Sequence, residues 1–291
     1  MPVPIRKPYP PHGPAGTIAA AALSAILTLT STQASAAQLS GYFRQSAPGI
    51  FINLESRQTA VTGPLSDRSQ PIDQILGFYA VDYGSIRLSA RHLGLQDGTL
   101  GFSNAGSSAA FQDMLTITSP TAAELSPGTM VARIDVSGNL LATGNGQSHY
   151  IVTVVTPSFG QQLSGAFYGP AISPTPGVII GNDFGSYLLE IPFFFGHPFS
   201  LSVAGDADAT VRLNDSGSAW TNLSSTVGWG GILDIRNESN MALAEFMVTS
   251  ESGYDYATVQ VVPLPGGAWL LGTGLLGLVV ARKRLLQRLS L

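Results

Sequence analysis

The chain has 291 residues, of which 44% are hydrophobic and only 11% charged, and it contains no cysteine. The absence of cysteine excludes a disulfide framework, a thiolate zinc site, an iron–sulfur cluster and a cysteine nucleophile. The low charge and the positive mean hydropathy argue against a disordered acidic or basic chain.

Charge is distributed unevenly along the chain. All 18 acidic residues lie between Glu55 and Asp255, and residues 37–261 hold eight arginines and no lysine, so this segment has a formal charge of −10. A nucleic-acid-binding protein needs clustered cations to displace counterions from phosphates, so nucleic acid is not an expected partner. The other basic residues flank apolar runs near the two ends, as in segments handled by membrane machinery.

Residues 1–36 predict an export signal peptide. A basic start without acidic residues leads into an apolar run, and Ala34, Ser35 and Ala36 then supply the small side chains that signal peptidase accepts. We therefore expect cleavage after Ala36, which makes Ala37 the first residue of the mature chain. The alternative is an uncleaved anchor, although the apolar run is shorter than the ~20 residues of a typical span.

The C-terminal end combines a proline motif, an uncharged apolar run and a basic cluster. In order, these are Val262, Pro263, Leu264 and Pro265; residues 266–281; and Arg282, Lys283 and Arg284. The prolines cannot continue a strand or enter a helix interior, so they end the preceding segment. The run is long enough to cross most of a ~30 Å hydrocarbon layer. We predict a transmembrane helix at 266–281, a cytoplasmic tail at 285–291, and residues 37–261 outside the membrane.

This three-part end, residues 262–284, resembles the PEP-CTERM sorting signal in its VPLPA-type variant. The resemblance implies recognition by exosortase, a membrane-embedded cysteine protease that processes the tail and releases or transfers the protein to the cell surface. Two positions depart from the family: Leu264 stands where the parent motif has Glu, and Gly266 stands where the variant usually has Ala. The alternative is an ordinary membrane anchor that stays attached.

The middle of the chain alternates apolar and polar residues with the period of β-strands. The alternation is clear at 85–90, 130–136, 199–204, 233–235 and 259–261. Further strands are expected at 50–54, 76–81, 111–118, 150–156, 178–180, 187–195, 210–213 and 245–249. Turn residues separate them, among them Ser137-Gly138-Asn139 and Gly144-Asn145-Gly146. Only residues 72–76 and 241–245 look briefly helical.

Many short strands with one apolar face each predict two sheets packed face to face. The expected fold is mainly β: a jelly-roll-like antiparallel β-sandwich at 37–261, preceded by the signal peptide and followed by one transmembrane helix. We expect one domain. The alternative is two domains divided in the proline-containing stretch at 169–176.

No compact catalytic or metal-binding motif occurs in the sequence. The four histidines (His12, His92, His149 and His197) show neither i, i+2 nor i, i+4 spacing, and there is no G-x-S-x-G elbow. We expect no catalytic residue, no metal and no cofactor, and we expect His92 and His197 to be solvated loop residues. A Ser–His–Asp triad dispersed along the chain stays open.

Two acidic residues leave further alternatives. Asp206 and Asp208 alternate along the chain, so they face the same side, and we expect a solvated turn or strand edge. The alternatives are the paired carboxylates of a glycosidase, or a structural calcium site completed by the Asn-Asp pairs at 182–183 or 214–215.

Aromatic residues cluster at two places. Three consecutive phenylalanines, Phe193 to Phe195, must point to both faces of a strand, so at least one is expected in the core. Tyr254 and Tyr256 share a face, where packing at a sheet margin is expected rather than ligand binding.

These features predict a non-catalytic exported protein of the bacterial cell surface or extracellular matrix. It would cross the inner membrane, stay anchored there transiently, and have signal peptidase and exosortase as partners. The first alternative is a secreted carbohydrate-binding module whose ligand is exopolysaccharide, and the second is a secreted hydrolase. An exposed aromatic strip would favour the first alternative, and a concave pocket joining a histidine, an aspartate and a serine would favour the second.

Overall fold

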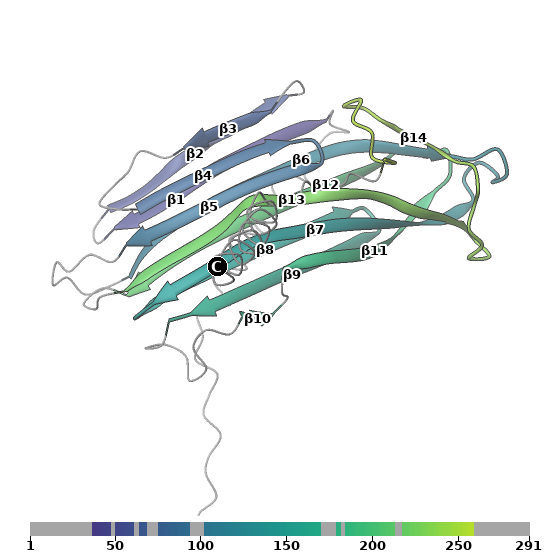
Figure 1. The fold of residues 1–291 in the computed structure, drawn as a ribbon. Helices are drawn as coiled ribbons and strands as arrows, with labels where there is room; N and C mark the ends of the chain where they lie inside the picture. The colour runs from purple at the N-terminus through teal and green to yellow at the C-terminus, as the bar shows by residue number, and fades with distance from the viewer. Residues whose placement is uncertain are drawn as a thin grey trace, which may run out of the picture. The chain divides into compact units, whose positions relative to one another are not determined.

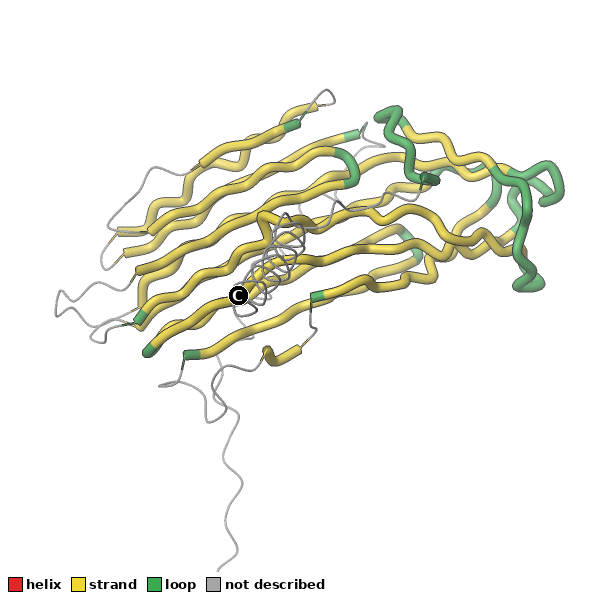
Figure 2. Tube along the Cα trace, viewed as in Figure 1, coloured by secondary structure: helices red, strands yellow, loops and turns green. Residues whose placement is uncertain are grey.

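The computed structural model describes residues 37–47, 50–60, 64–68, 75–93, 102–169, 179–181, 184–212 and 217–258. The strands in these residues form two antiparallel sheets (Figure 1). Figure 2 shows that turns and loops join the strands, and no helix occurs in the described residues. The prediction of a mainly β chain with two packed sheets is confirmed.

One sheet has eight strands and the other has six. The eight-stranded sheet runs β10-β9-β8-β12-β6-β1-β2, with β14 also paired to β6, and the six-stranded sheet runs β11-β7-β13-β5-β4-β3. The eight-stranded sheet contains β1 (Gln38–Ala47), β2 (Ile50–Ala60), β6 (Phe102–Thr118), β8 (Gly146–Thr156), β9 (Phe159–Tyr168), β10 (Ile179–Gly181), β12 (Phe199–Arg212) and β14 (Met247–Ser250). The six-stranded sheet contains β3 (Leu65–Arg68), β4 (Ile75–Asp82), β5 (Ser85–Leu93), β7 (Pro127–Thr143), β11 (Gly185–Phe194) and β13 (Ser218–Asn237).

The hydrophobic core lies between the two sheets. In β4, for example, Ile75, Tyr79 and Val81 are buried while the residues between them are partly exposed. Buried residues from both sheets form one hydrophobic cluster, and strands on either side of the 169–176 stretch contribute to it. The sheets approach closely at Gly41, where an added Cβ would lie 2.3 Å from the ring of Tyr79.

One predicted turn is wrong for an identifiable reason. Ser137-Gly138-Asn139 lies inside β7, next to a register shift between Asn222 and Thr226 of β13. A Cβ at Gly138 would lie 2.3 Å from the backbone oxygen of Asn222, so glycine marks a bulge and a close backbone approach here. The turn predicted at Gly144 is confirmed, and its φ of 52° lies in the region that glycine reaches without strain.

Most of the predicted strands are present and are longer than expected. The strands that were not predicted are β1, β3, β9 and the first halves of β6 and β13. The helical interpretation of 241–245 is wrong, because Asn240 has a φ of 58° and turns the chain back onto β13. There Leu243 N donates to the backbone oxygen of Ile235 at 2.8 Å. Of 72–76, Ile75 and Leu76 belong to β4 and the other residues lie outside the described part.

The predicted terminal segments lie outside the described residues. These are the signal peptide at 1–36, the strand at 259–261, the sorting signal at 262–284 with its helix at 266–281, and the tail at 285–291. Ala37, the predicted first residue of the mature chain, is buried just before β1. Among the described residues, no helix has the length and apolar character needed to span a bilayer.

Candidate functional site

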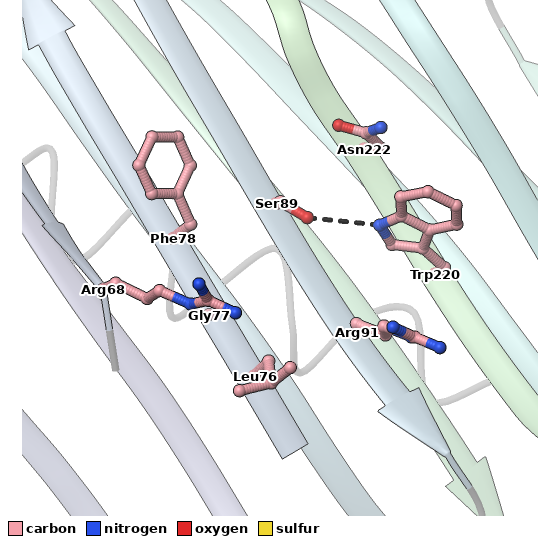
Figure 3. A pocket seen from close by; sticks show the side chains of 8 residues that line it. All are labelled: Arg68, Leu76, Gly77, Phe78, Ser89, Arg91, Trp220 and Asn222. Carbon is pink, nitrogen blue, oxygen red and sulfur yellow. Dashed lines mark hydrogen bonds between the residues drawn. The ribbon is translucent and has the colours of Figure 1, made fainter. Parts of the chain in front are cut away.

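The outer face of the six-stranded sheet has a groove of about 300 Å³ over β3, β4, β5 and β13. Alternation decides which side chains reach it: Ile75, Leu88 and Thr221 are buried, so their neighbours along each strand point outward. Figure 3 shows the residues that line this groove, which are Arg68, Leu76, Gly77, Phe78, Ser89, Arg91, Trp220 and Asn222.

Strand register arranges the groove in two adjacent rows. In the first row Phe78 of β4 pairs with Ser89 of β5, which pairs with Asn222 of β13. In the second row Leu76, Arg91 and Trp220 occupy the same three strands. Each row therefore holds one aromatic ring and at least one polar side chain, and the two aromatic residues stand on opposite sides of β5 (Figure 3).

The indole of Trp220 is held by two neighbours. Its Nε1 donates to Ser89 Oγ at 3.2 Å, and the guanidinium carbon of Arg91 lies 6.0 Å from the ring centroid. Trp220 and Phe78 are partly exposed, and Arg68 and Arg91 are exposed. The groove therefore offers aromatic surface, guanidinium groups and an amide to a ligand, on the rigid framework of a sheet.

A second polar group lies on the outer face of the eight-stranded sheet. Four strands bring Arg44 of β1, Gly106 of β6, Asp208 of β12 and His149 of β8 into one row. In the neighbouring row Ser108 of β6 lies between Tyr42 and Asp206. Asp206 and Asp208 thus share a face, as the alternation predicted.

The expectation that these two aspartates are solvated at a turn or strand edge is wrong. They lie inside β12, which is flanked by β6 and β8, and Asp208 is only 7% exposed. Arg44 Nη2 donates to Asp208 Oδ1 at 2.7 Å, and Ser108 donates to Asp206. Arg44 and Asp208 meet above Gly106, where a Cβ would lie only 2.7 Å from Asp208 Oδ1, so a larger residue would crowd this ion pair. The carboxylates are therefore occupied by side chains of the protein itself.

Burial dominates the ionisation of this polar group. It raises the pKa of Asp206 to about 6, with the negative charge of Asp208 adding to the rise and Ser108 and Arg44 opposing it. Burial lowers the pKa of His149, although Asp208 works in the other direction. Burial also lowers the pKa of Arg44, but the charge and hydrogen bond of Asp208, together with Tyr42 and Asp206, outweigh it and leave that pKa raised.

The histidines occupy three different environments. The expectation that His92 is solvated is wrong: it is fully buried in β5, shares a hydrogen bond with Ser103, and burial lowers its pKa to about 4. His197 is an exposed loop residue, as expected. His149 lies beside Asp208, and its backbone N–H donates to Thr221 Oγ1 of the facing sheet at 3.0 Å.

The aromatic clusters pack as the sequence indicated. Phe193 and Phe195 are buried and Phe194 is 52% exposed, so the prediction that at least one is in the core is confirmed. Tyr256 is fully buried, 4.7 Å from the ring of Tyr254, and its backbone oxygen accepts a hydrogen bond from the indole of Trp229. These tyrosines close the core beside the strands.

The described residues contain no group of three or more His, Asp or Glu side chains placed to hold a metal ion. The Asn-Asp pairs at 182–183 and 214–215, which the calcium alternative required, lie outside the described part.

Sequence reasoning missed the groove because it did not predict the strand that carries Trp220 and Asn222. The sequence signal there is weak, because Thr221 stands between Ala219 and Leu223 on the core-facing side and interrupts the apolar alternation. Comparison of the chain with protein-family models gives no match, and comparison with curated proteins gives none either.

Proposed function

We propose that this chain is a non-catalytic exported protein of the cell surface or extracellular matrix that binds carbohydrate through the groove on its six-stranded sheet. The observation that carries the proposal is the pair of partly exposed aromatic residues, Trp220 and Phe78, with polar side chains between and beside them. A pyranose ring packs its C–H face on an aromatic ring, and its hydroxyl groups bond to polar groups around that ring. Ser89, Asn222 and Arg91 are placed for such bonds.

The absence of catalysis is supported by the state of the acidic side chains. A glycosidase needs two carboxyl groups with room between them for a sugar. Asp208 is instead held by Arg44, and Asp206 accepts from Ser108. The hydrolase alternative required a pocket joining a histidine, an aspartate and a serine. His92 has a serine partner, but burial of the whole side chain keeps it from substrate.

We also propose that the sandwich is a jelly roll. The support is the strand order of its central eight strands. In the six-stranded sheet β5, β13, β7 and β11 are neighbours, and in the other sheet β6, β12, β8 and β9 are neighbours. Along the chain, β5, β6, β7 and β8 lie alternately in the two sheets, and β11, β12 and β13 do so again. This order is the one expected of a jelly roll, in which two four-stranded sheets face each other. The other strands extend the edges of the two sheets, except for β14, which pairs with the end of β6.

Export and anchoring form the second half of the proposal. The signal peptide directs the chain across the inner membrane, signal peptidase removes it, and the C-terminal run then anchors the protein until exosortase processes the sorting signal. Support comes from the joint occurrence of the A-x-A site, the proline motif, the apolar run and the basic cluster. A surface location would also bring the groove into contact with exopolysaccharide, the ligand class proposed for it.

The groove is tested by glycan binding. We expect the full-length chain, kept in mild detergent because of its apolar C-terminal run, to bind a subset of polysaccharides on an array of surface glycans. The change Trp220→Ala should weaken that binding about 30-fold, since a stacked aromatic ring acts as a hot spot. The matched control is Phe194→Ala, an exposed aromatic residue on the same sheet outside the groove. Equal binding by both variants, or no glycan bound at all, would contradict the proposal.

Sorting is tested by the mass of the mature protein in cells with and without exosortase. We expect loss of a C-terminal fragment containing residues 266–281 only where exosortase is active. Replacing Pro263 and Pro265 together with alanine should preserve the full tail even in the presence of exosortase, because the extended motif is lost. An intact C-terminus in every strain would show an ordinary anchor instead.

A further inference from the structure

Arginines on the outer face of the six-stranded sheet fall into two groups. At the β7 and β11 side, acidic neighbours neutralise Arg133 and Arg236: Arg133 Nε lies 3.1 Å from Asp135, and Arg236 Nε lies 2.8 Å from Asp234. At the groove side Arg68, Arg87 and Arg91 are exposed, and none of them forms an ion pair with an acidic residue of the described chain.

Three arginines without an acidic partner among the described residues stand out because residues 37–261 are strongly acidic overall. Residues 37–261 carry 18 acidic residues and only eight arginines, yet three of those arginines lie together around one groove. Two of the three, Arg68 and Arg91, line the groove itself together with Phe78 and Trp220 (Figure 3). Guanidinium groups that have no acidic partner among the described residues and lie beside aromatic surface provide charge complementarity for an anionic ligand that also has an apolar face.

We infer that the groove selects acidic polysaccharides, binding sugars that carry a carboxylate, over neutral ones. The inference rests on the proposed carbohydrate function and names the class of its ligand. A uronate presents the C–H face of its ring to Trp220 or Phe78 and its planar carboxylate to a guanidinium, which matches two oxygens with two N–H groups. Arg91 is placed to bind the carboxylate of a sugar stacked on Trp220, because its guanidinium carbon lies 6.0 Å from the centroid of the indole ring.

A single-stranded nucleic acid also combines negative charge with stacking surfaces, but this face fits it less well. Such a strand needs cations along a continuous track. On the β7 and β11 side of this face Arg133 and Arg236 are already neutralised by acidic residues, so a phosphate chain that left the groove in that direction would pass over paired charges. One or two charged sugars need only the arginines of the groove.

The test compares polygalacturonate with the same polymer after methyl esterification, which removes the charge and keeps the sugar ring. We expect the full-length chain to bind polygalacturonate at least about tenfold more tightly, with the preference falling as salt is raised. Arg68→Gln and Arg91→Gln should each lose about tenfold for the acid form and little for the ester. The matched control is Arg236→Gln, which changes a neutralised arginine on the same face.

Each other outcome has a definite meaning. If both polymers bind equally and Trp220→Ala weakens both, the carbohydrate function stands and the preference for acidic sugars is wrong. If dextran sulfate binds as tightly as polygalacturonate, the groove recognises negative charge without regard to the carboxylate, and the inference that it selects carboxylate-bearing sugars is wrong. Tighter binding of single-stranded oligothymidylate would replace the glycan by a nucleic acid. If no glycan binds, the proposed function itself fails.

Discussion

Replacing His92 by leucine is expected to make the stability of the protein less sensitive to acid. Between pH 6.5 and pH 4 the unchanged protein should lose about 3 kcal/mol of unfolding free energy through His92, and the leucine variant should not lose it. Burial lowers the pKa of His92 to about 4, whereas an unfolded histidine titrates near ~6.5. Between those values the unfolded chain binds a proton that the folded chain does not, so stability falls as pH falls. The loss is complete near pH 4, where the folded histidine also becomes charged.

The buried position of His92 explains the direction. Its side chain is fully buried in β5, and Ser103 is its hydrogen-bond partner, while Nδ1 has no partner among the residues that the structure describes. A charged imidazolium there would lose its hydration without gaining an acidic neighbour. The measurement is the free energy of unfolding in denaturant at a series of pH values. The control His197→Gln removes an exposed histidine and should leave the pH dependence unchanged.

Asp206 contributes with the opposite sign. Its pKa is raised to about 6, so the folded chain holds a proton that the unfolded chain has released between about pH 4 and pH 6. This contribution favours folding at low pH and declines as pH rises through 6. The change Asp206→Asn should therefore steepen the acid loss that His92 causes. A pH profile unchanged by either substitution would show that burial does not control these groups.

Much of the fold could be predicted because alternation is a local property. The strands β4, β5, β7, β8 and β12 show apolar residues at every second position, and each was found from the sequence. The start of β13 has serine, threonine and asparagine instead, and its stability comes from pairing with β7 on one side and β5 on the other. Such tertiary support cannot be read from the residues of one strand.

His92 shows where the same rule was applied too narrowly. Ile86, Leu88 and Ala90 are buried on even positions, and His92 continues that face to the end of β5. Ending the predicted strand at residue 90 placed the histidine in a loop. The alternation itself, extended by two residues, would have predicted a buried histidine.

The two polar sites depend on contacts between distant parts of the chain. Trp220 and Ser89 are 131 residues apart in sequence, and Arg44 and Asp208 are 164 apart. The sequence could show that Asp206 and Asp208 face one side, because that needs only their spacing. It could not show which residues they meet, because strand order and register decide that.

Substitution of Asp208 by asparagine is expected to destabilise the protein by about 2 to 3 kcal/mol. Arg44 Nη2 lies 2.7 Å from Asp208 Oδ1, with only 10% of the aspartate side chain and 32% of the arginine exposed. Removing the negative charge of Asp208 leaves a partly buried guanidinium without the carboxylate that it bonds, and only the weaker interaction with Asp206 remains. The value is placed at the low end because the arginine is about one third exposed.

A double-mutant cycle separates this coupling from general damage to β12. Arg44→Met removes the guanidinium that Asp208→Asn leaves without its bonded carboxylate. The double variant should therefore regain about 1 kcal/mol or more of unfolding free energy relative to Asp208→Asn alone. The matched control pair is Arg236 and Asp234, 2.8 Å apart with 28% and 29% of their side chains exposed. There we expect a coupling below about 1 kcal/mol, because solvent reaches the carboxylate of Asp234, whereas only 10% of the Asp208 side chain is exposed. Additive losses at Arg44 and Asp208, measured by denaturant unfolding at pH 7, would show that the two charges do not depend on each other.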